Sequence, residues 1–172
     1  MAGSLIKLQE TIANNDVSVI LGNTYWDTSY DVYVVKLSNL KPAVDNGLAR
    51  MRILSSGSVV SSANYLKADK GLRSDSAFNN NVISNGTYWE FDRAGNAGGE
   101  NFNGTFFLYN FNNASEFNWT TFELTQSSPF DLVYGCTGGG CHKVIQTANG
   151  IEFWFSSGNI ASGVLTLYGL KK

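Results

Sequence analysis

Charged residues are scarce in this sequence. Asp, Glu, Lys and Arg together make up 15% of the 172 residues, the net charge is −2, and no run of Lys or Arg occurs along the chain. Nucleic-acid binding requires a basic surface that neutralises phosphates, so we expect no nucleic-acid partner. No apolar run approaches the roughly 18 residues of a membrane-spanning helix, so we expect no membrane span.

Proline, cysteine and histidine are also rare, with 2, 2 and 1 copies. A structural zinc site uses about four Cys or His ligands, and a catalytic triad needs a serine poised beside a histidine. Residues 1–7 contain no charged region followed by an apolar one, so no secretory signal is expected. We therefore expect a protein without enzymatic activity, cofactor or metal, made in a cytoplasm.

Glycine, aromatic side chains and uncharged polar residues are abundant instead. There are 18 glycines and the aromatic fraction is 13%, which is typical of all-β proteins with many turns. Side chains alternate with a period of two in a series of short segments, several of them beside Asn-Gly pairs that favour tight turns. The predicted strands are Leu5–Ile12, Val17–Leu21, Tyr30–Leu37, Leu48–Leu54, Tyr65–Ala68, Thr87–Asp92, Gly104–Phe111, Trp119–Thr125, Ile151–Phe155 and Val164–Leu170.

The spacing of these strands predicts one all-β domain over residues 1–172, a jelly-roll-like β-sandwich. No stretch keeps a helical apolar stripe, so we expect no helix longer than about three turns. Residues 70–85 have no clear period and are expected to form a long surface loop.

Both cysteines and the only histidine lie in the sequence CTGGGCHK, at Cys136, Cys141 and His142. Metal binding is the weakest interpretation, because the stretch offers at most three ligands. A disulfide across the three glycines and a pair of free thiols both remain open. In each case we expect an exposed, glycine-rich loop and not a reactive centre.

Glu90 and Asp92 are two residues apart on a predicted strand, so both carboxylates project from one face. Retaining glycosidases place two carboxyl groups about 5 Å apart, and laminarinase-type hydrolases carry such a pair followed by another glutamate. Here Ala94 and Gly95 occupy the positions of that glutamate. A solvated strand face is therefore the preferred interpretation, with a glycosidase as the alternative.

Exposed aromatic rings could stack on the apolar face of a sugar. The candidate stacking residues are Trp154, Trp89 and Trp26, with Tyr88 and Trp119 as further candidates. Trp154 is the strongest, because it points away from the apolar face of its predicted strand. For each ring the alternative is a place in the core, where aromatic side chains are common.

The segment Ile151–Leu170 (IEFWFSSGNIASGVLTLYGL) resembles the closing motif of tailed-bacteriophage virion structural proteins, described as tail-fibre or head-decoration components. The pattern G-G-x-H-K at Gly139–Lys143 and the opening segments Leu5–Lys7 and Tyr30–Pro42 resemble the same group. The middle of the chain, residues 66–103, matches only loosely. Cys136 and Cys141 are not part of the pattern.

This resemblance implies a non-enzymatic surface protein of a virion, either a fibre-type or a head-decoration appendage, made in the host bacterial cytoplasm. Its partners would be other virion proteins of the capsid or tail, and a host-surface glycan. Surplus apolar side chains in Tyr30–Leu37 and Gly104–Phe111 predict a homo-oligomer, which we expect to be a homotrimer. The N-terminal segment is a candidate attachment arm. A stand-alone carbohydrate-binding module is the alternative function.

Overall fold

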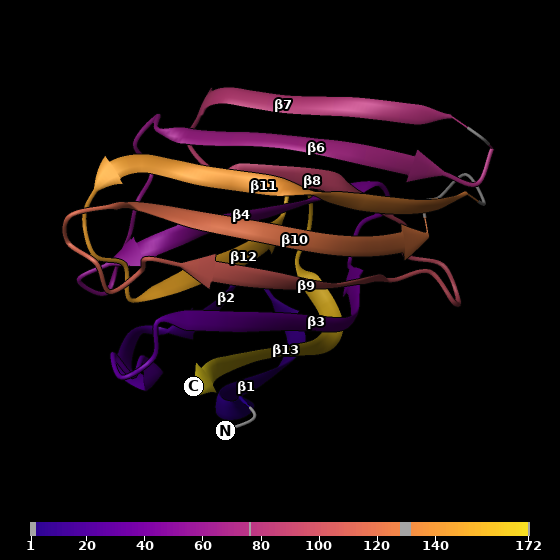
Figure 1. The fold of residues 1–172 in the computed structure, drawn as a ribbon. Helices are drawn as coiled ribbons and strands as arrows, with labels where there is room; N and C mark the ends of the chain where they lie inside the picture. The colour runs from indigo at the N-terminus through magenta and orange to yellow at the C-terminus, as the bar shows by residue number, and fades with distance from the viewer. Residues whose placement is uncertain (1–2, 76, 128–131, 172) are drawn as a thin grey trace.

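The structure is a computed structural model that describes residues 3–75, 77–127 and 132–171 (Figure 1). Two antiparallel sheets pack face to face, and the expected all-β sandwich is confirmed. The single helical element in the described ranges is one 3-10 turn, η1 (Asn23–Tyr25).

The larger sheet has eight strands and the smaller has five. The large sheet has the order β1 (Ser4–Asp16), β13 (Ile160–Lys171), β3 (Val32–Pro42), β9 (Phe102–Tyr109), β10 (Phe117–Ser127), β11 (Val133–Ile145), β6 (Tyr65–Arg73) and β7 (Phe78–Gly86). The small sheet has the order β2 (Val19–Gly22), β12 (Gly150–Phe155), β4 (Gly47–Ser55) and β5 (Ser58–Val59), and β8 (Trp89–Ala94) also pairs with β4.

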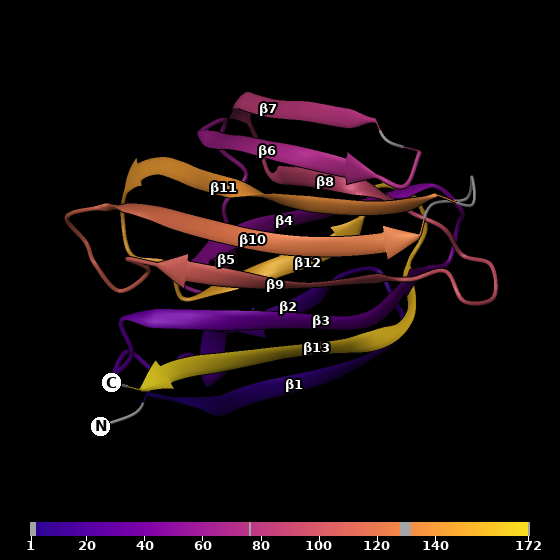
Figure 2. The same ribbon diagram turned by 45° about the vertical axis from the view of Figure 1, so that its right-hand side comes forward.

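One half of this sandwich has jelly-roll connectivity. Strands β1, β13, β3 and β9 pack over β2, β12, β4 and β8, so the first and last strands are neighbours and the chain winds back and forth between the sheets. Two insertions extend the large sheet. One adds β6 and β7 between β4 and β8, and the other adds β10 and β11 between β9 and β12. The large sheet therefore overhangs the small one on the β7 side (Figure 2).

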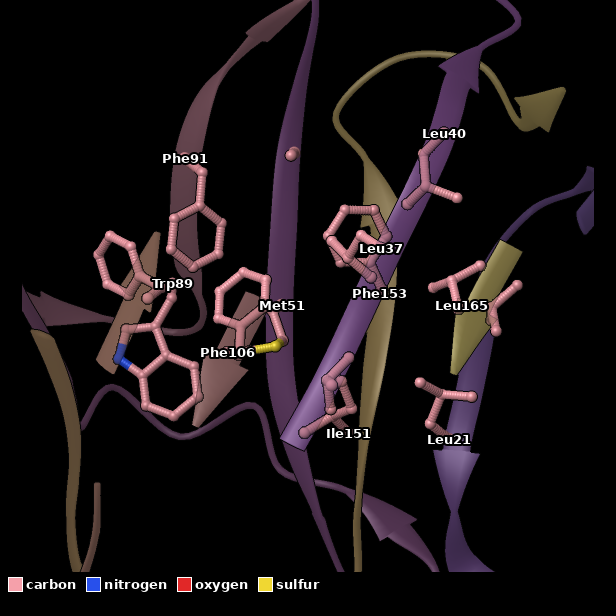
Figure 3. Packing of buried hydrophobic residues seen from close by; sticks show 14 of the residues in the cluster. Leu21, Leu37, Leu40, Met51, Trp89, Phe91, Phe106, Ile151, Phe153 and Leu165 are labelled. Carbon is pink, nitrogen blue, oxygen red and sulfur yellow. The ribbon is translucent and has the colours of Figure 1, made fainter. Parts of the chain in front are cut away.

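The core fills the space between the sheets with aromatic and branched aliphatic side chains (Figure 3). Phe91 of β8 packs edge-to-face against Phe106 of β9 and Phe122 of β10, with ring centroids 5.2 and 5.0 Å apart. Full burial of one such side chain contributes about 1.5–3 kcal/mol, and edge-to-face pairs add about 0.5–1.5 kcal/mol. The alternation seen in the sequence thus reflects one face of each strand turned inward.

The tight turns require residues that accept a positive φ. Asn46 has φ 65° just before β4, and Gly158 has φ 67° between β12 and β13, as the sequence predicts. A Cβ on Gly158 would also lie 2.6 Å from the side chain of Val44. The Asn103-Gly104 pair, by contrast, lies inside β9 and makes no turn.

Two predicted loops are strands in the structure. Residues 70–85 belong to the hairpin of β6 and β7, apart from its turn; residue 76 lies outside the described part of the chain. The stretch Cys136–Lys143 lies within β11, between β10 and β6. The N-terminal segment expected as an attachment arm is the edge strand β1, hydrogen-bonded to β13 along its length.

Candidate functional site

Gly138 and Gly140 of β11 allow neighbouring groups to approach the strand closely. A Cβ on Gly138 would lie 2.4 Å from the carbonyl oxygen of Ala68, and one on Gly140 would lie 2.7 Å from the indole nitrogen of Trp89. Glycine disfavours strands, which is why the stretch reads as a turn in the sequence. Here glycine is required, because the backbone of β6 and the indole of Trp89 leave no space for a side chain at positions 138 and 140.

Cys136, Cys141 and His142 are therefore not an exposed loop, because all three are buried. The two cysteines are free and lie on opposite faces of β11, five residues or about 16 Å apart along the strand. A disulfide needs Cα atoms within about 7 Å, so the disulfide alternative is wrong. Burial raises the pKa of Cys136 to about 12 and also raises the pKa of the Cys141 thiol.

His142 packs against the ring of Tyr65, with centroids 4.6 Å apart, and its Nε2 lies 3.4 Å from Oγ of Ser62. Its Nδ1 has no hydrogen-bond partner among the described residues. Burial lowers the pKa of His142, which favours the neutral ring. Within the described ranges, no group of three or more metal-ligating side chains comes together.

Glu90 and Asp92 of β8 are each half-buried, and both border a hollow between β8 and the strands β6 and β7. Oε2 of Glu90 lies 2.7 Å from the guanidinium of Arg50 on β4. A second ion pair, Arg52 with Glu152, lies alongside on β4 and β12 at 2.6 Å. The carboxylate of Glu90 is thus held by a neighbouring cation, as in a structural cross-strand pair.

Two of the three candidate stacking tryptophans are part of the packing. Trp89 is 0% exposed, and its indole N–H donates to the carbonyl of Leu66 at 2.9 Å. Trp26 stacks on Tyr33 with centroids 3.7 Å apart, and its N–H donates to Asn112. The prediction that Trp89 stacks on a ligand is therefore wrong. One face of the Trp26 ring is already covered by Tyr33.

Trp154 is half-buried on the outer face of the small sheet. Its ring meets the edge of Tyr88 with centroids 5.4 Å apart, and the guanidinium of Arg52 lies 4.9 Å from its centre. A cation over an aromatic ring contributes about 0.5–1 kcal/mol at exposed sites. Both partners compete with any ligand for the ring of Trp154.

Trp119 is the exposed tryptophan, with 47% of its surface accessible. It lies on β10 opposite Tyr109 of β9 and Cys141 of β11. The sequence named Trp119 only as a further stacking candidate. Its polar neighbours Asn118 and Thr120 turn inward and are buried. The alternation places Trp119 on the face of β10 opposite Asn118, Thr120, Phe122 and Leu124, all of which are buried.

The outer face of the large sheet carries two adjacent apolar rows, and no described segment crosses it (Figure 1). Each row crosses several strands. The first row is Tyr168, Val34, Phe107, Thr121, Gly139, Ala68 and Val82, and the second is Val32, Tyr109, Trp119, Cys141 and Leu66. In these rows Phe107, Trp119 and Val82 are exposed, whereas Val34 and Cys141 are buried. Exposed aromatic and aliphatic side chains that gather on one face are typical of an interaction surface.

Two hollows lie on opposite sides of β6 and β7. The outer one, here called the trough, has a volume of about 720 Å³ and crosses β10, β11, β6 and β7. Phe117 and Trp119 form one wall, Val82 and Ser84 the other, and the floor is small and apolar. The inner one, the cleft, has a volume of about 580 Å³ and lies where the small sheet ends at β8.

The cleft is polar. Its lining includes Asn79, Asn81 and Lys67. Lys67 and Asp69 form a buried ion pair, and Asn81 donates to the other carboxylate oxygen of Asp69 at 2.8 Å. These groups satisfy one another, so the floor of the cleft is a closed polar network.

Comparison with known proteins identifies no relative: no family model matches the chain, and neither a curated protein nor a solved structure shows significant similarity to it. No helix in the described ranges has the length and apolar character needed to cross a membrane.

Proposed function

We propose that this protein is a non-enzymatic surface protein of a bacteriophage virion, a fibre-type or head-decoration appendage that self-associates and contacts host-surface glycans. The observation that carries the proposal is the outer face of the large sheet, which no described segment covers (Figure 1) and on which Phe107 and Trp119 are exposed. A chain with this face needs a partner to cover it, and a repetitive particle supplies many identical copies.

The place of the terminal motif in the fold supports the resemblance. Its first part forms β12, between β2 and β4, and its last part forms β13, between β1 and β3. The connection turns at Gly158, with φ 67°. The similar residues are thus central strands of both sheets, so the resemblance concerns residues that specify the jelly roll.

The self-association surface that we propose is the part of the outer face over β13, β3 and β9. Tyr168, Val34 and Phe107 form its centre. In the next row, Lys36 of β3 and Glu123 of β10 lie on either side of Thr105. One charge of each sign at the border lets neighbouring copies related by a rotation axis pair them, and the closed homotrimer that we propose is one such assembly.

Light scattering on the purified protein at micromolar concentration tests the oligomer. We expect the mass of a trimer, and we expect Phe107→Glu to give a monomer, because Phe107 is 39% exposed and the substitution places a charge in the centre of the surface. A wild-type monomer that stays monomeric at high concentration would contradict self-association in solution.

Immunogold labelling of purified phage particles tests the location. We expect gold at the capsid or at the tail, and its position separates decoration from fibre. Particles that carry no copy of the protein would exclude the virion assignment.

A stand-alone carbohydrate-binding module is the second candidate, and the trough beside Trp119 is the observation that favours it. A glycan array with the isolated protein tests this function, since such a module binds sugars whether or not it occurs on a particle.

A further inference from the structure

We infer that the trough binds a pyranose glycan that carries acidic groups, with one sugar ring stacked on Trp119 and the next rings lying over Gly139 and Ala68. This inference deepens the glycan contact in the proposed function and rests on it, because it names the site and the class of sugar. Three features lead to it: the exposed and unpartnered indole of Trp119, the low apolar floor of the trough, and the charge of the residues that line the trough.

Trp119 is the tryptophan that the fold leaves free. Trp26 and Trp89 each donate an indole hydrogen bond inside the protein, and Trp154 packs between Tyr88 and Arg52. The indole of Trp119 has no hydrogen bond, ring contact or cation contact with any other described residue, and Trp119 is 47% exposed. An exposed indole costs solvation free energy that a stacked ligand recovers.

Gly139 keeps the floor of the trough low without being required for packing. A Cβ at Gly139 would touch only the carbonyl oxygen of Thr120, at 3.5 Å, which is an ordinary contact. Its neighbours Gly138 and Gly140 would collide with Ala68, Asp69 or Trp89. Glycine in a strand costs about 0.5–1 kcal/mol relative to alanine, so the missing side chain at Gly139 is best explained by the space it leaves.

The size of the trough matches a short oligosaccharide. Its volume of about 720 Å³ falls within the roughly 300–1,000 Å³ of small-ligand sites. From β10 to β7 the floor crosses three strand spacings, or about 14 Å. A ligand of several linked rings fits along that line better than a single sugar.

Because the trough is open to solvent, it suits a sugar better than a wholly apolar ligand such as an acyl chain. Its apolar floor is open to solvent along its length, so an acyl chain lying there would keep one side in water. A pyranose has an apolar face for Trp119 and the floor, while its hydroxyl groups stay hydrated or reach Thr121 and Ser84 at the walls. A second copy of the chain would have to place side chains in the trough, because specific interfaces are packed like protein interiors.

The charge at the trough favours an acidic glycan. Among the described residues that line it, none is acidic, whereas Lys143 is exposed at the end of the β11 floor. The ammonium group of Lys143 has no ion pair with any described residue. A carboxylate on the sugar would form a charge-assisted hydrogen bond there, roughly twice as strong as a neutral one.

The test is titration calorimetry of the full chain with alginate-derived hexasaccharides as the acidic probe and laminarin-derived hexasaccharides as the neutral one. We expect binding of the acidic probe, weakened by salt, and weaker binding of the neutral probe. Trp119→Ala and Gly139→Val should each reduce the affinity for the acidic probe by about tenfold or more. Lys143→Gln should remove the preference for the acidic probe.

Gly135→Val is the matched control for Gly139→Val. Gly135 is on the same face of β11, outside the trough, and a Cβ there would lie 3.7 Å from Leu72. We expect this variant to bind like the wild type, and both variants to keep the circular dichroism spectrum. If Gly139→Val fails to fold, the exposed Trp119→Ala variant decides. Affinity that is unchanged in Trp119→Ala, or absence of binding by both probes, would overturn the inference.

The outcomes separate the two proposals. A protein that labels phage particles but binds neither probe refutes the inference and leaves the virion assignment intact. A protein that binds the acidic probe through Trp119 but is absent from particles refutes the virion assignment alone.

Discussion

The indole of Trp89 lies directly against the backbone of Gly140. A Cβ on Gly140 would be 2.7 Å from the indole nitrogen of Trp89, and that nitrogen donates to the carbonyl of Leu66 on the neighbouring strand. The glycine run of β11 and the buried tryptophan of β8 therefore depend on each other: the bulk of Trp89 occupies the space that a side chain at position 140 would need.

Alanine substitutions along this glycine run should separate into two classes. Gly138→Ala and Gly140→Ala should each destabilise the fold by about 1–3 kcal/mol or more, because the added methyl group has no space. Gly139→Ala should leave stability unchanged or raise it by up to about 1 kcal/mol. Urea denaturation followed by tryptophan fluorescence measures all three, and equal losses at the three positions would contradict this prediction.

The buried ion pair of Lys67 and Asp69 gives a second prediction. Lys67→Met removes one partner and leaves a buried carboxylate, which typically costs about 3–5 kcal/mol. Adding Asp69→Asn should recover most of that loss, since the amide keeps an acceptor for Asn81 without the charge. A double-mutant cycle by chemical denaturation checks this. A double variant as unstable as Lys67→Met would show that the charge of Asp69 is not responsible.

The two cysteines should be unreactive in the folded protein. The thiolate is the nucleophile, and burial raises the pKa of Cys136 to about 12 and raises that of Cys141 as well. Ellman's reagent at pH 8 should therefore react only slowly with the native chain. After denaturation it should react with both thiols. An intact mass lower by two hydrogens would instead reveal a disulfide.

Stability should depend on pH through His142, the only histidine in the chain. Burial lowers its pKa in the folded state, whereas in the unfolded chain the pKa is about 6.5. Between these two values the unfolded state binds more protons, so stability rises with pH across that window. The contribution is fully present above about 6.5 and declines as the pH falls toward the folded-state pKa.

Melting curves of the wild type and of His142→Gln between pH 5 and pH 7.5 check the histidine prediction. The slope of the wild type is limited to about 1.4 kcal/mol per pH unit, the value for one proton. The variant should lose most of that slope. A slope that persists in His142→Gln would place its origin in another group.

The sequence predicted strands where side-chain alternation and β-forming residues coincide. All ten predicted segments overlap strands of the structure, from β1 to β13. It missed the two-residue strand β5. It also missed β7 and β11, whose sequences are rich in asparagine and glycine. Both are strands because β6 pairs with each of them, and pairing with a distant segment is not visible in local composition.

The site was harder to predict because alternation alone does not say which face of a strand is covered. On β8, the charged Glu90 and Asp92 share one face, so Trp89 and Phe91 had to share the other; this signal identifies Trp89 as a core residue. On β10, the polar Asn118, Thr120 and Gln126 point inward. Phe122 and Leu124 point inward with them, so the alternation of these two residues with Trp119 is a signal in the sequence that Trp119 is exposed.

The pairing of β1 with β13 has a practical consequence for anyone who handles this protein. Ser4 pairs with Lys171, so both ends of the described chain leave from the same border of the large sheet (Figure 1). The opposite border, β7, is seven strand spacings away, or about 34 Å. An affinity tag, a fluorophore or a sensor surface attached at either end would therefore orient every molecule alike, with Trp119 and the trough on the half of the sheet remote from the attachment point.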